Sequence, residues 1–112
     1  MALAAASAVA FILGAAQAAE LQTQPVPGGW IAVSLQEDMV VKAARFAITE
    51  QSRQMHRELK LLSIKHARQQ VVAGSQYSMN LMVQGEGKRH LVVATVWAKP
   101  DGSMELTRWH WV

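Results

Sequence analysis

Cysteine is absent from the 112 residues of this chain, and aspartate is scarce, with only Asp38 and Asp101. The sequence therefore provides no disulfide, no thiol nucleophile and no thiolate metal site. No serine lies in the glycine-flanked setting of a hydrolase nucleophile, and no glycine-rich phosphate loop opens a helix. These absences predict that the protein is not an enzyme and needs no cofactor.

The sequence also contains few residues that could form a metal site or a nucleic acid site. The four histidines lie on separate predicted elements without ligand spacing, although His90 and His110 could meet across neighbouring strands. The net charge of +3 is spread from Lys42 to Arg108 without a basic cluster in the sequence. This pattern is typical of a solvated surface, so we expect no metal and no nucleic acid partner.

The N-terminus has the composition of a targeting segment. Residues 2–19 are uncharged and rich in alanine, and Ala16-Gln17-Ala18 fits a small-x-small cleavage site. We expect a signal peptide over residues 1–18 and a mature domain over residues 19–112, secreted or periplasmic and free of the membrane after cleavage. No Lys or Arg precedes Lys42, so either the start is truncated or the free amino terminus supplies the charge of the signal. A membrane anchor and a disordered alanine-rich tail are the alternatives.

The first half of the domain predicts an extended arm, a short strand and one long helix. The arm covers residues 21–29, and Trp30–Val33 reads as the strand. Ser34 and Glu37 have capping-box spacing, so the helix is expected from Leu35 to about Arg53. Its apolar face would be formed by small residues with Phe46 as the one large side chain: Val40, Ala43, Ala44, Ala47 and Ile48.

The second half predicts four consecutive strands joined by hairpins. The period changes to two over residues 59–70, 74–84, 89–97 and 104–112. Gly85-Glu86-Gly87 and Pro100-Asp101-Gly102-Ser103 are turn sequences. The resulting fold class is α+β, with one long helix packed across a five-stranded antiparallel sheet.

Gln70-Val71-Val72-Ala73-Gly74 is the most unusual segment, because it places two valines where a short turn favours Gly, Asn or Asp. Either it forms a strained, apolar hairpin tip that contacts a partner, or the valines belong to the strands and Ala73-Gly74-Ser75 is the turn. The hairpin topology puts three apolar segments on one edge of the sheet, where they would form a wedge suited to a cleft in another protein: Val26-Pro27-Gly28, Val71-Val72-Ala73, and Trp97 with Pro100.

These segments resemble the cystatins, reversible inhibitors of papain-like cysteine proteases, over roughly residues 25–97. Gln70–Gly74 fits the Gln-x-Val-x-Gly loop of that family, and Gly28-Gly29 falls at its N-terminal glycine. Ala43–Ile48 is similar to the Leu-Ala-Arg-Phe-Ala-Val helix motif of plant cystatins, and Val96–Pro100 resembles the strand that enters their second loop. The resemblance implies the same fold, a helix wrapped by a five-stranded antiparallel sheet.

The resemblance also implies a mechanism in which the wedge blocks a protease cleft without presenting a cleavable bond. Val71, Val72 and Ala73 would contact the centre of the cleft, with Gln70 and Gly74 supporting the loop. Val26 and Pro27 would occupy apolar subsites, and Gly28, followed by Gly29, would let the arm turn away from the catalytic thiol. Trp97, Pro100 and Asp101 would form the second loop.

One departure concerns that second loop, where secreted plant and animal members usually have Pro-Trp and this chain has Pro100-Asp101. Trp97, Trp109 or Trp111 could compensate only if their side chains reach the edge. A non-inhibitory binding module with the same fold is therefore the alternative function. We expect a monomer, with a domain-swapped dimer as a further possibility if the valine turn opens.

Overall fold

The computed structural model describes residues 29–112. The expected signal peptide, its cleavage site and the arm residues Val26, Pro27 and Gly28 lie outside the described residues. One helix and five strands form the domain: β1 (Trp30–Ala32), α3 (Asp38–Met55), β2 (Lys60–Val72), β3 (Gly74–Gly85), β4 (Lys88–Ala98) and β5 (Met104–Trp111).

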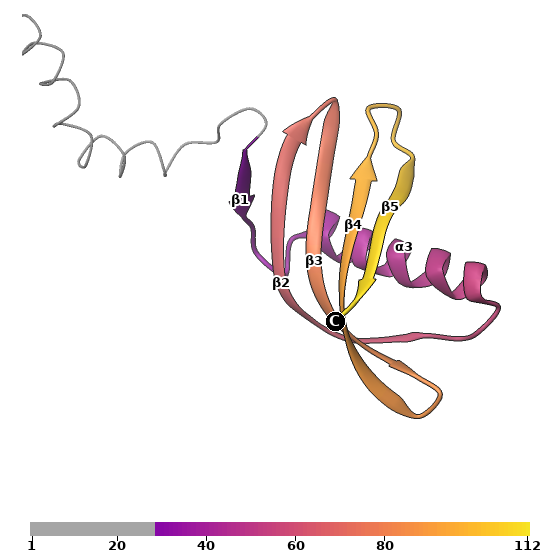
Figure 1. Ribbon diagram of the computed structural model, residues 1–112. Coiled ribbons are helices and arrows are strands. Elements are labelled where there is room, and N and C mark those ends of the chain that lie inside the picture. Colours follow the sequence, from indigo (N-terminus) through magenta and orange to yellow (C-terminus); the bar gives the residue numbers. More distant parts are fainter. Residues whose placement is uncertain (1–28) are drawn as a thin grey trace, which may run out of the picture.

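The strands form one antiparallel sheet in the order β1-β2-β3-β4-β5, and α3 lies across one face of it (Figure 1). Each neighbour in the sheet is also the next strand in the chain, because every pair from β2 onward is joined by a hairpin. This architecture confirms the predicted α+β class, with one helix on a five-stranded antiparallel sheet. No described helix is both long enough and apolar enough to cross a membrane.

The helix begins three residues later than expected, and the predicted capping box does not form. Glu37 is the N-cap residue and makes no hydrogen bond through its side chain. The Ser34 hydroxyl instead accepts a bond at 3.1 Å from the backbone N–H of Gln36, which closes a turn before the helix. The backbone N–H of Glu37 also donates to the Ser34 carbonyl oxygen at 3.3 Å, and Glu37 itself is extended, so residues 34–37 form a separate turn and the helix starts after it.

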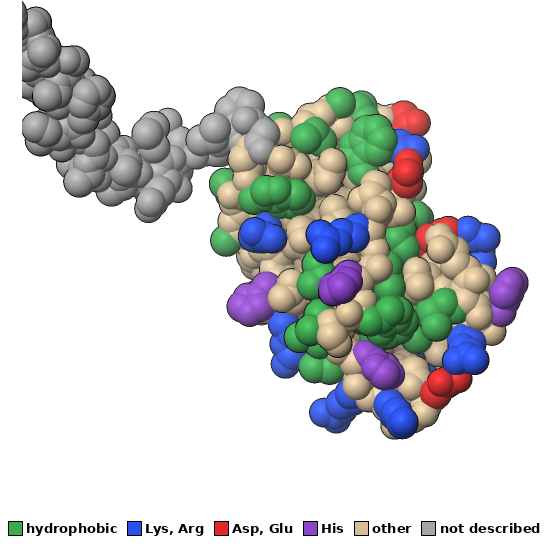
Figure 2. All heavy atoms as spheres, in the orientation of Figure 1, with side chains coloured by type: hydrophobic (Ala, Val, Ile, Leu, Met, Phe, Trp, Pro, Cys, Tyr) green, Lys and Arg blue, Asp and Glu red, His purple; other side chains and the backbone are tan. Residues whose placement is uncertain are grey.

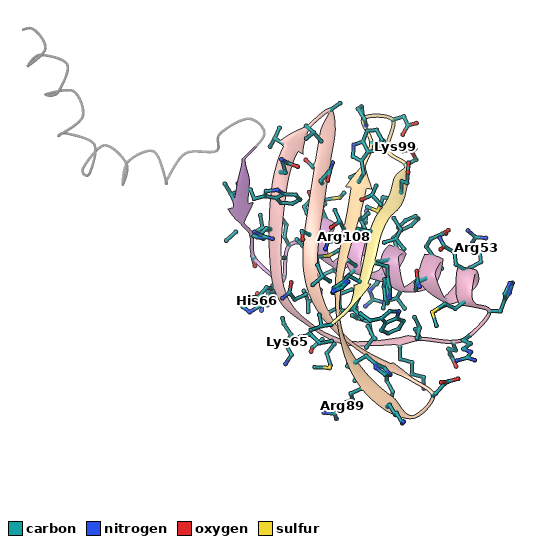
Figure 3. All side chains as sticks on the ribbon, viewed as in Figure 1. Arg53, Lys65, His66, Arg89, Lys99 and Arg108 are labelled. Carbon is teal, nitrogen blue, oxygen red and sulfur yellow. The ribbon has the colours of Figure 1, made fainter. Side chains whose placement is uncertain are left out.

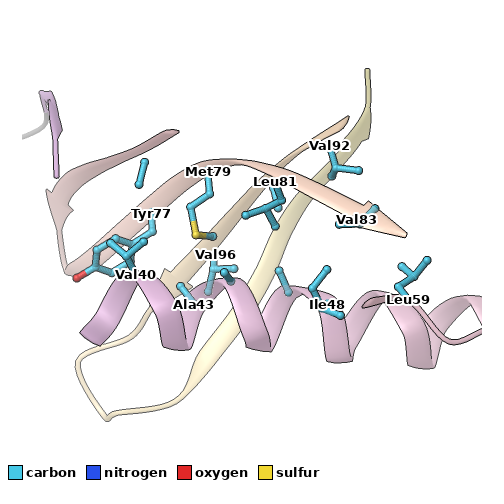
Figure 4. Packing of buried hydrophobic residues seen from close by; sticks show 14 residues of the cluster. Val40, Ala43, Ile48, Leu59, Tyr77, Met79, Leu81, Val83, Val92 and Val96 are labelled. Carbon is cyan, nitrogen blue, oxygen red and sulfur yellow. The ribbon is translucent and has the colours of Figure 1, made fainter. Parts of the chain in front are cut away.

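The core lies between α3 and the concave face of the sheet (Figure 4). The five helix residues predicted for the apolar face are all buried, and three of them are alanines with no exposed surface. These alanines let the helix approach the larger side chains of β3 and β4 closely. Phe46, expected as the large central side chain, is only half-buried at the margin of this core. The larger buried side chains of the core come from the sheet: Tyr77, Met79, Leu81, Val83, Val92 and Val96.

The strand boundaries differ from prediction mainly in β2, which extends through Val72 instead of ending at Gln70. The lower half of this strand carries register shifts between Leu61 and Ser63 and between Ile64 and His66. Since β1 pairs only with residues 68–70, the bulged half of β2 is an open edge. Bulges and charged side chains at an open edge disfavour pairing with another chain.

The β3–β4 turn offers a test of local backbone conformation. Glu86 and Gly87 both have positive φ, 56° and 78°, which is the pattern of a two-residue type I′ turn. Asparagine adopts this conformation more readily than glutamate, so Glu86→Asn should raise the free energy of unfolding by about 0.5 to 1 kcal/mol, measured by urea denaturation. The ion pair with Arg57 is lost, but both side chains are more than half exposed, so that loss costs little.

Glu86→Gln is the matched control, since it removes the same charge without favouring positive φ. We expect its stability to stay close to that of the natural protein. An asparagine variant no more stable than the glutamine variant would contradict this interpretation of the turn.

Candidate functional site

Three segments meet at one end of the sheet, opposite the β3–β4 turn: the start of β1, the β2–β3 tip and the β4–β5 tip (Figure 1). Trp30 at the start of β1 pairs with Gln70 just before the β2–β3 tip. Ser75, just after that tip, pairs with Ala98 at the end of β4. The strand register therefore confirms the predicted common edge, with the chain entering β1 from the same end.

Val71 and Val72 belong to strand β2. This is the second of the two interpretations of the sequence, in which the valines are part of the strand and not of the turn. Val71 pairs with Ser75 and Val72 with Gly74, so the chain reverses direction at Ala73. Neither valine has positive φ, and the left-handed residue at this tip is Gly74, with φ 83°. The backbone strain expected at the valines is therefore absent, but their side chains remain 43% and 37% exposed. The tip is an ordered, apolar projection.

Position 74 requires a glycine both because of its positive φ angle and because its surroundings leave no room for a Cβ atom. A Cβ atom at this position would lie 2.1 Å from the carbonyl oxygen of Ala98 on β4. Such a distance is impossible without moving backbone, because Gly74 is held by its pairing with Val72 and Ala98 by its pairing with Ser75. The glycine thus lets the β2–β3 tip pack directly on the strand that leads to the second tip.

Trp97 joins the two tips. Its indole N–H donates a hydrogen bond of 2.8 Å to the carbonyl oxygen of Ala73, at the point where the chain reverses. The ammonium group of Lys99 lies 5.3 Å from the centre of its ring, within range of a cation–π interaction. Trp97 therefore extends from β4 to the β2–β3 tip. The only sign of this contact in the sequence is an aromatic residue near the predicted edge.

The β4–β5 tip is a tight polar turn around Asp101. The N–H of Gly102 donates to the Lys99 carbonyl oxygen at 3.0 Å, and Gly102 has φ 92°. The side-chain hydroxyl and backbone N–H of Ser103 both donate to Asp101 Oδ1, at 2.7 and 2.9 Å. These bonds hold the pKa of Asp101 below its ordinary value, the hydroxyl bond having the larger effect. The second tip therefore presents an ionised carboxylate where an aromatic side chain was expected from the resemblance.

Two other tryptophans lie too far from this edge to replace that aromatic side chain. Trp109 pairs with Ala94 and Trp111 with Val92, both toward the opposite end of β4. Trp111 stacks edge-on against His90, with ring centres 5.3 Å apart. His90 therefore does not meet His110, which pairs with Val93. Within residues 29–112, no group of acidic or histidine side chains is arranged to hold a metal ion.

Trp30 is a site residue that the sequence interpretation missed. It is exposed, stands beside Gln70, and its ring lies 5.5 Å from the guanidinium carbon of Arg68. The available signal was a large aromatic residue directly after Gly28-Gly29, at the point where the arm becomes a strand. Trp30 extends the apolar surface of the β2–β3 tip toward the arm.

The α+β domain therefore presents the exposed side chains of Val71 and Val72 on an ordered tip at one edge of its sheet. Residues 33–110 match the family model described as aspartic acid proteinase inhibitor. Cysteine proteinase inhibitor 3 of rice, Oryza sativa subsp. japonica, is 36% identical over 75 residues, which cover 67% of this chain and 41% of that protein. Cysteine proteinase inhibitor 3 of Arabidopsis thaliana is 40% identical over 57 residues, covering 51% of this chain and 46% of that protein.

Solved structures agree on the fold. A salivary cystatin from the soft tick Ornithodoros moubata superposes with a TM-score of 0.67 at 20% identity, covering 78% of this chain and 99% of that one. Dimeric human cystatin F gives a TM-score of 0.66 at 16% identity, covering 80% and 91%. This chain belongs to the cystatin family and is not an enzyme. It spans about half the length of the curated relatives it matches.

Proposed function

We propose that this protein is a reversible, non-covalent inhibitor of papain-like cysteine proteases that acts from a secreted or periplasmic location. The β2–β3 tip and the β4–β5 tip would enter the active-site cleft, together with the arm that contains Val26, Pro27 and Gly28. The observation that carries this proposal is the exposed Val71-Val72 pair on a tip fixed by Gly74 and Trp97. A preformed apolar tip loses little conformational entropy on binding, which favours tight occlusion.

A second candidate function is inhibition of aspartic proteases. The specific observation is the matching family model, described as aspartic acid proteinase inhibitor. Titration of papain and pepsin with the protein distinguishes the candidates. Nanomolar inhibition of papain supports the first proposal, and inhibition of pepsin alone supports the second. Activity against neither protease favours a non-inhibitory binding module.

The arm provides a test of the wedge within the first proposal. Gly28→Glu, or removal of residues 1–28, should weaken papain inhibition by well over tenfold. The added side chain would collide with the cleft, and the deletion removes the apolar arm contacts. The measurement is the inhibition constant.

Thr49→Glu is the matched control for the added charge, because Thr49 is exposed on α3 and not at the binding edge. Its inhibition constant should remain unchanged. Equal inhibition by the Gly28→Glu variant and the natural protein would rule out the wedge.

A domain-swapped dimer is a separate proposal about the oligomeric state. If the β2–β3 tip opened, β2 and β3 would form one long strand, and two chains could trade their N-terminal halves. Without strain at Val71 and Val72, opening would break the Trp97–Ala73 bond without relieving backbone conflict at the valines. We therefore propose a monomer as the resting state, checked by gel filtration before and after heating at high concentration.

A further inference from the structure

The face of the sheet that points away from α3, here called the outer face, is distinct from the proposed inhibitory edge. Its residues follow from the register, since directly paired residues and alternate residues along a strand point to the same side. Met79 and Ala94 are buried in the core on the helix side. Their neighbours Ser78 and Thr95 therefore face outward, with the rest of their paired row.

Basic side chains gather on this outer face although they are scattered in the sequence. Arg68 pairs with Ser78, and Arg108 pairs with Thr95. Gln84 on β3 pairs with Lys60 on β2 and, on its other side, with Arg89 on β4. Lys65 lies at a bulge of β2 beside them. In Figure 2 blue and purple side chains occupy the sheet face toward the viewer, whereas red ones lie at its right-hand margin. The sequence-based expectation of no basic cluster is thus wrong for the folded surface.

Little negative charge offsets this surface. Among the outward-pointing strand positions of residues 29–112, the acidic residue is Glu105, which pairs with Trp97 next to the β4–β5 tip. Glu105 is already engaged, because its carboxylate lies 3.0 Å from the ammonium group of Lys99. The basic side chains of the outer face therefore have no acidic partner among the other outward-pointing strand positions of residues 29–112.

Two rows give this surface a regular spacing. Arg68, Ser78, Thr95 and Arg108 form one row across β2 to β5, and His66, Asn80, Val93 and His110 form the next. Three strand spacings separate the two arginines, about 14 Å. Figure 3 shows Arg108 over the middle of the sheet and His66 at its left-hand margin, with Lys65 and Arg89 continuing toward the β3–β4 turn. Ser78 and Thr95 lie between the two arginines, and Asn80 and Val93 lie between the two histidines.

We propose that the outer face binds a linear, sulfated polysaccharide, with Arg68 and Arg108 as its two principal anchors. Guanidinium groups match the geometry of sulfate oxygens with paired N–H donors. The amide of the half-buried Asn80 would face the sugar hydroxyls between them, whereas Ser78 and Thr95, each 8% exposed, lie beneath this surface. A nucleic acid fits less well, because the aromatic residues of this face, Trp30 and Trp97, lie at its end near the tips and already contact Arg68 and Lys99, and the middle of β3 and β4 has none for base stacking.

The test uses the full chain and fluorescein-labelled heparin, with binding followed by fluorescence anisotropy at increasing salt. We expect saturable binding that weakens as salt rises, since exposed charges are screened. The Arg68→Gln/Arg108→Gln double variant should bind heparin about tenfold more weakly. The Lys42→Gln/Arg45→Gln variant is the control, because it removes the same two charges from exposed positions on α3 and should bind like the natural protein.

Oligothymidylate and vesicles containing phosphatidylserine are measured in parallel. Stronger binding to either probe than to heparin would overturn the choice of polysaccharide. Equal weakening in the two double variants would overturn the outer face as the site, because the attraction would then follow net charge alone. Absence of heparin binding at low salt would overturn the proposal entirely, and an unchanged far-ultraviolet circular dichroism spectrum ensures that each variant is folded.

Discussion

Gly74→Ala should raise the inhibition constant for papain by more than a hundredfold and lower the free energy of unfolding by about 2 to 4 kcal/mol. Alanine is disfavoured at φ 83°, and its Cβ would lie 2.1 Å from the carbonyl oxygen of Ala98. The β2–β3 tip must then move away from β4, which breaks the bond from Trp97 to Ala73. Inhibition assays and urea denaturation of the same preparations measure the two effects.

Gly102→Ala separates the collision from the backbone conformation. Gly102 also has positive φ, 92°, but a Cβ there would meet no atom within 4 Å. This variant should lose only about 1 kcal/mol of stability, the ordinary cost of a left-handed alanine. Equal destabilisation by the two substitutions would show that the contact with Ala98 does not fix the tip. A destabilised Gly74→Ala variant that inhibits papain normally would contradict the role of the β2–β3 tip in inhibition, while the packing of Gly74 against Ala98 would stand.

Ala43→Leu should lower the free energy of unfolding by about 3 kcal/mol, a large part of the stability of so small a domain. Ala43 has no exposed surface and lies where α3 crosses the sheet, close to Val96 (Figure 4). A leucine adds three carbon atoms to a helix–sheet interface that is already filled, so the helix must lift from the sheet. Thermal and urea denaturation measure the loss.

Ala32→Leu is the control, since Ala32 is exposed on β1 and the larger side chain has room in solvent. Its stability should change by less than about 0.5 kcal/mol. If Ala43→Leu were tolerated equally well, close approach of α3 to the sheet would not depend on the alanines. In that case the small residues of the helix would reflect helix propensity alone.

Much of the fold could be predicted because its signals are local. The spacing of Val40, Ala43, Ala47 and Ile48 identifies the buried stripe of the helix from sequence alone. Turn residues such as Gly102 mark the hairpins, which order the strands and place three segments on one edge. The helix start was misplaced because Ser34 and Glu37 have the spacing of a capping box, whereas in the structure they close a turn before the helix and Glu37 is the N-cap.

The candidate site was only partly predictable, because its rigidity depends on contacts between distant strands. The Gln70–Gly74 segment was recognisable, but the place of its valines in β2 is decided by pairing with β3. The bond from Trp97 to Ala73 joins residues 24 positions apart, and no sequence period encodes it. The departure at Asp101 was visible, whereas its ordered, ionised state follows from the bonds with Ser103.

By itself the sequence determined the α+β class, the cystatin resemblance and the absence of cysteine, because periodicity, turn residues and motifs are properties of neighbouring residues. Only the tertiary structure decided that Gly74 lies against Ala98 and that Trp97 holds the β2–β3 tip. It also gathered Arg68 and Arg108 on one face, 40 positions apart in the chain. Strand register is the physical reason, since it brings side chains together according to pairing across the sheet and not according to distance along the chain.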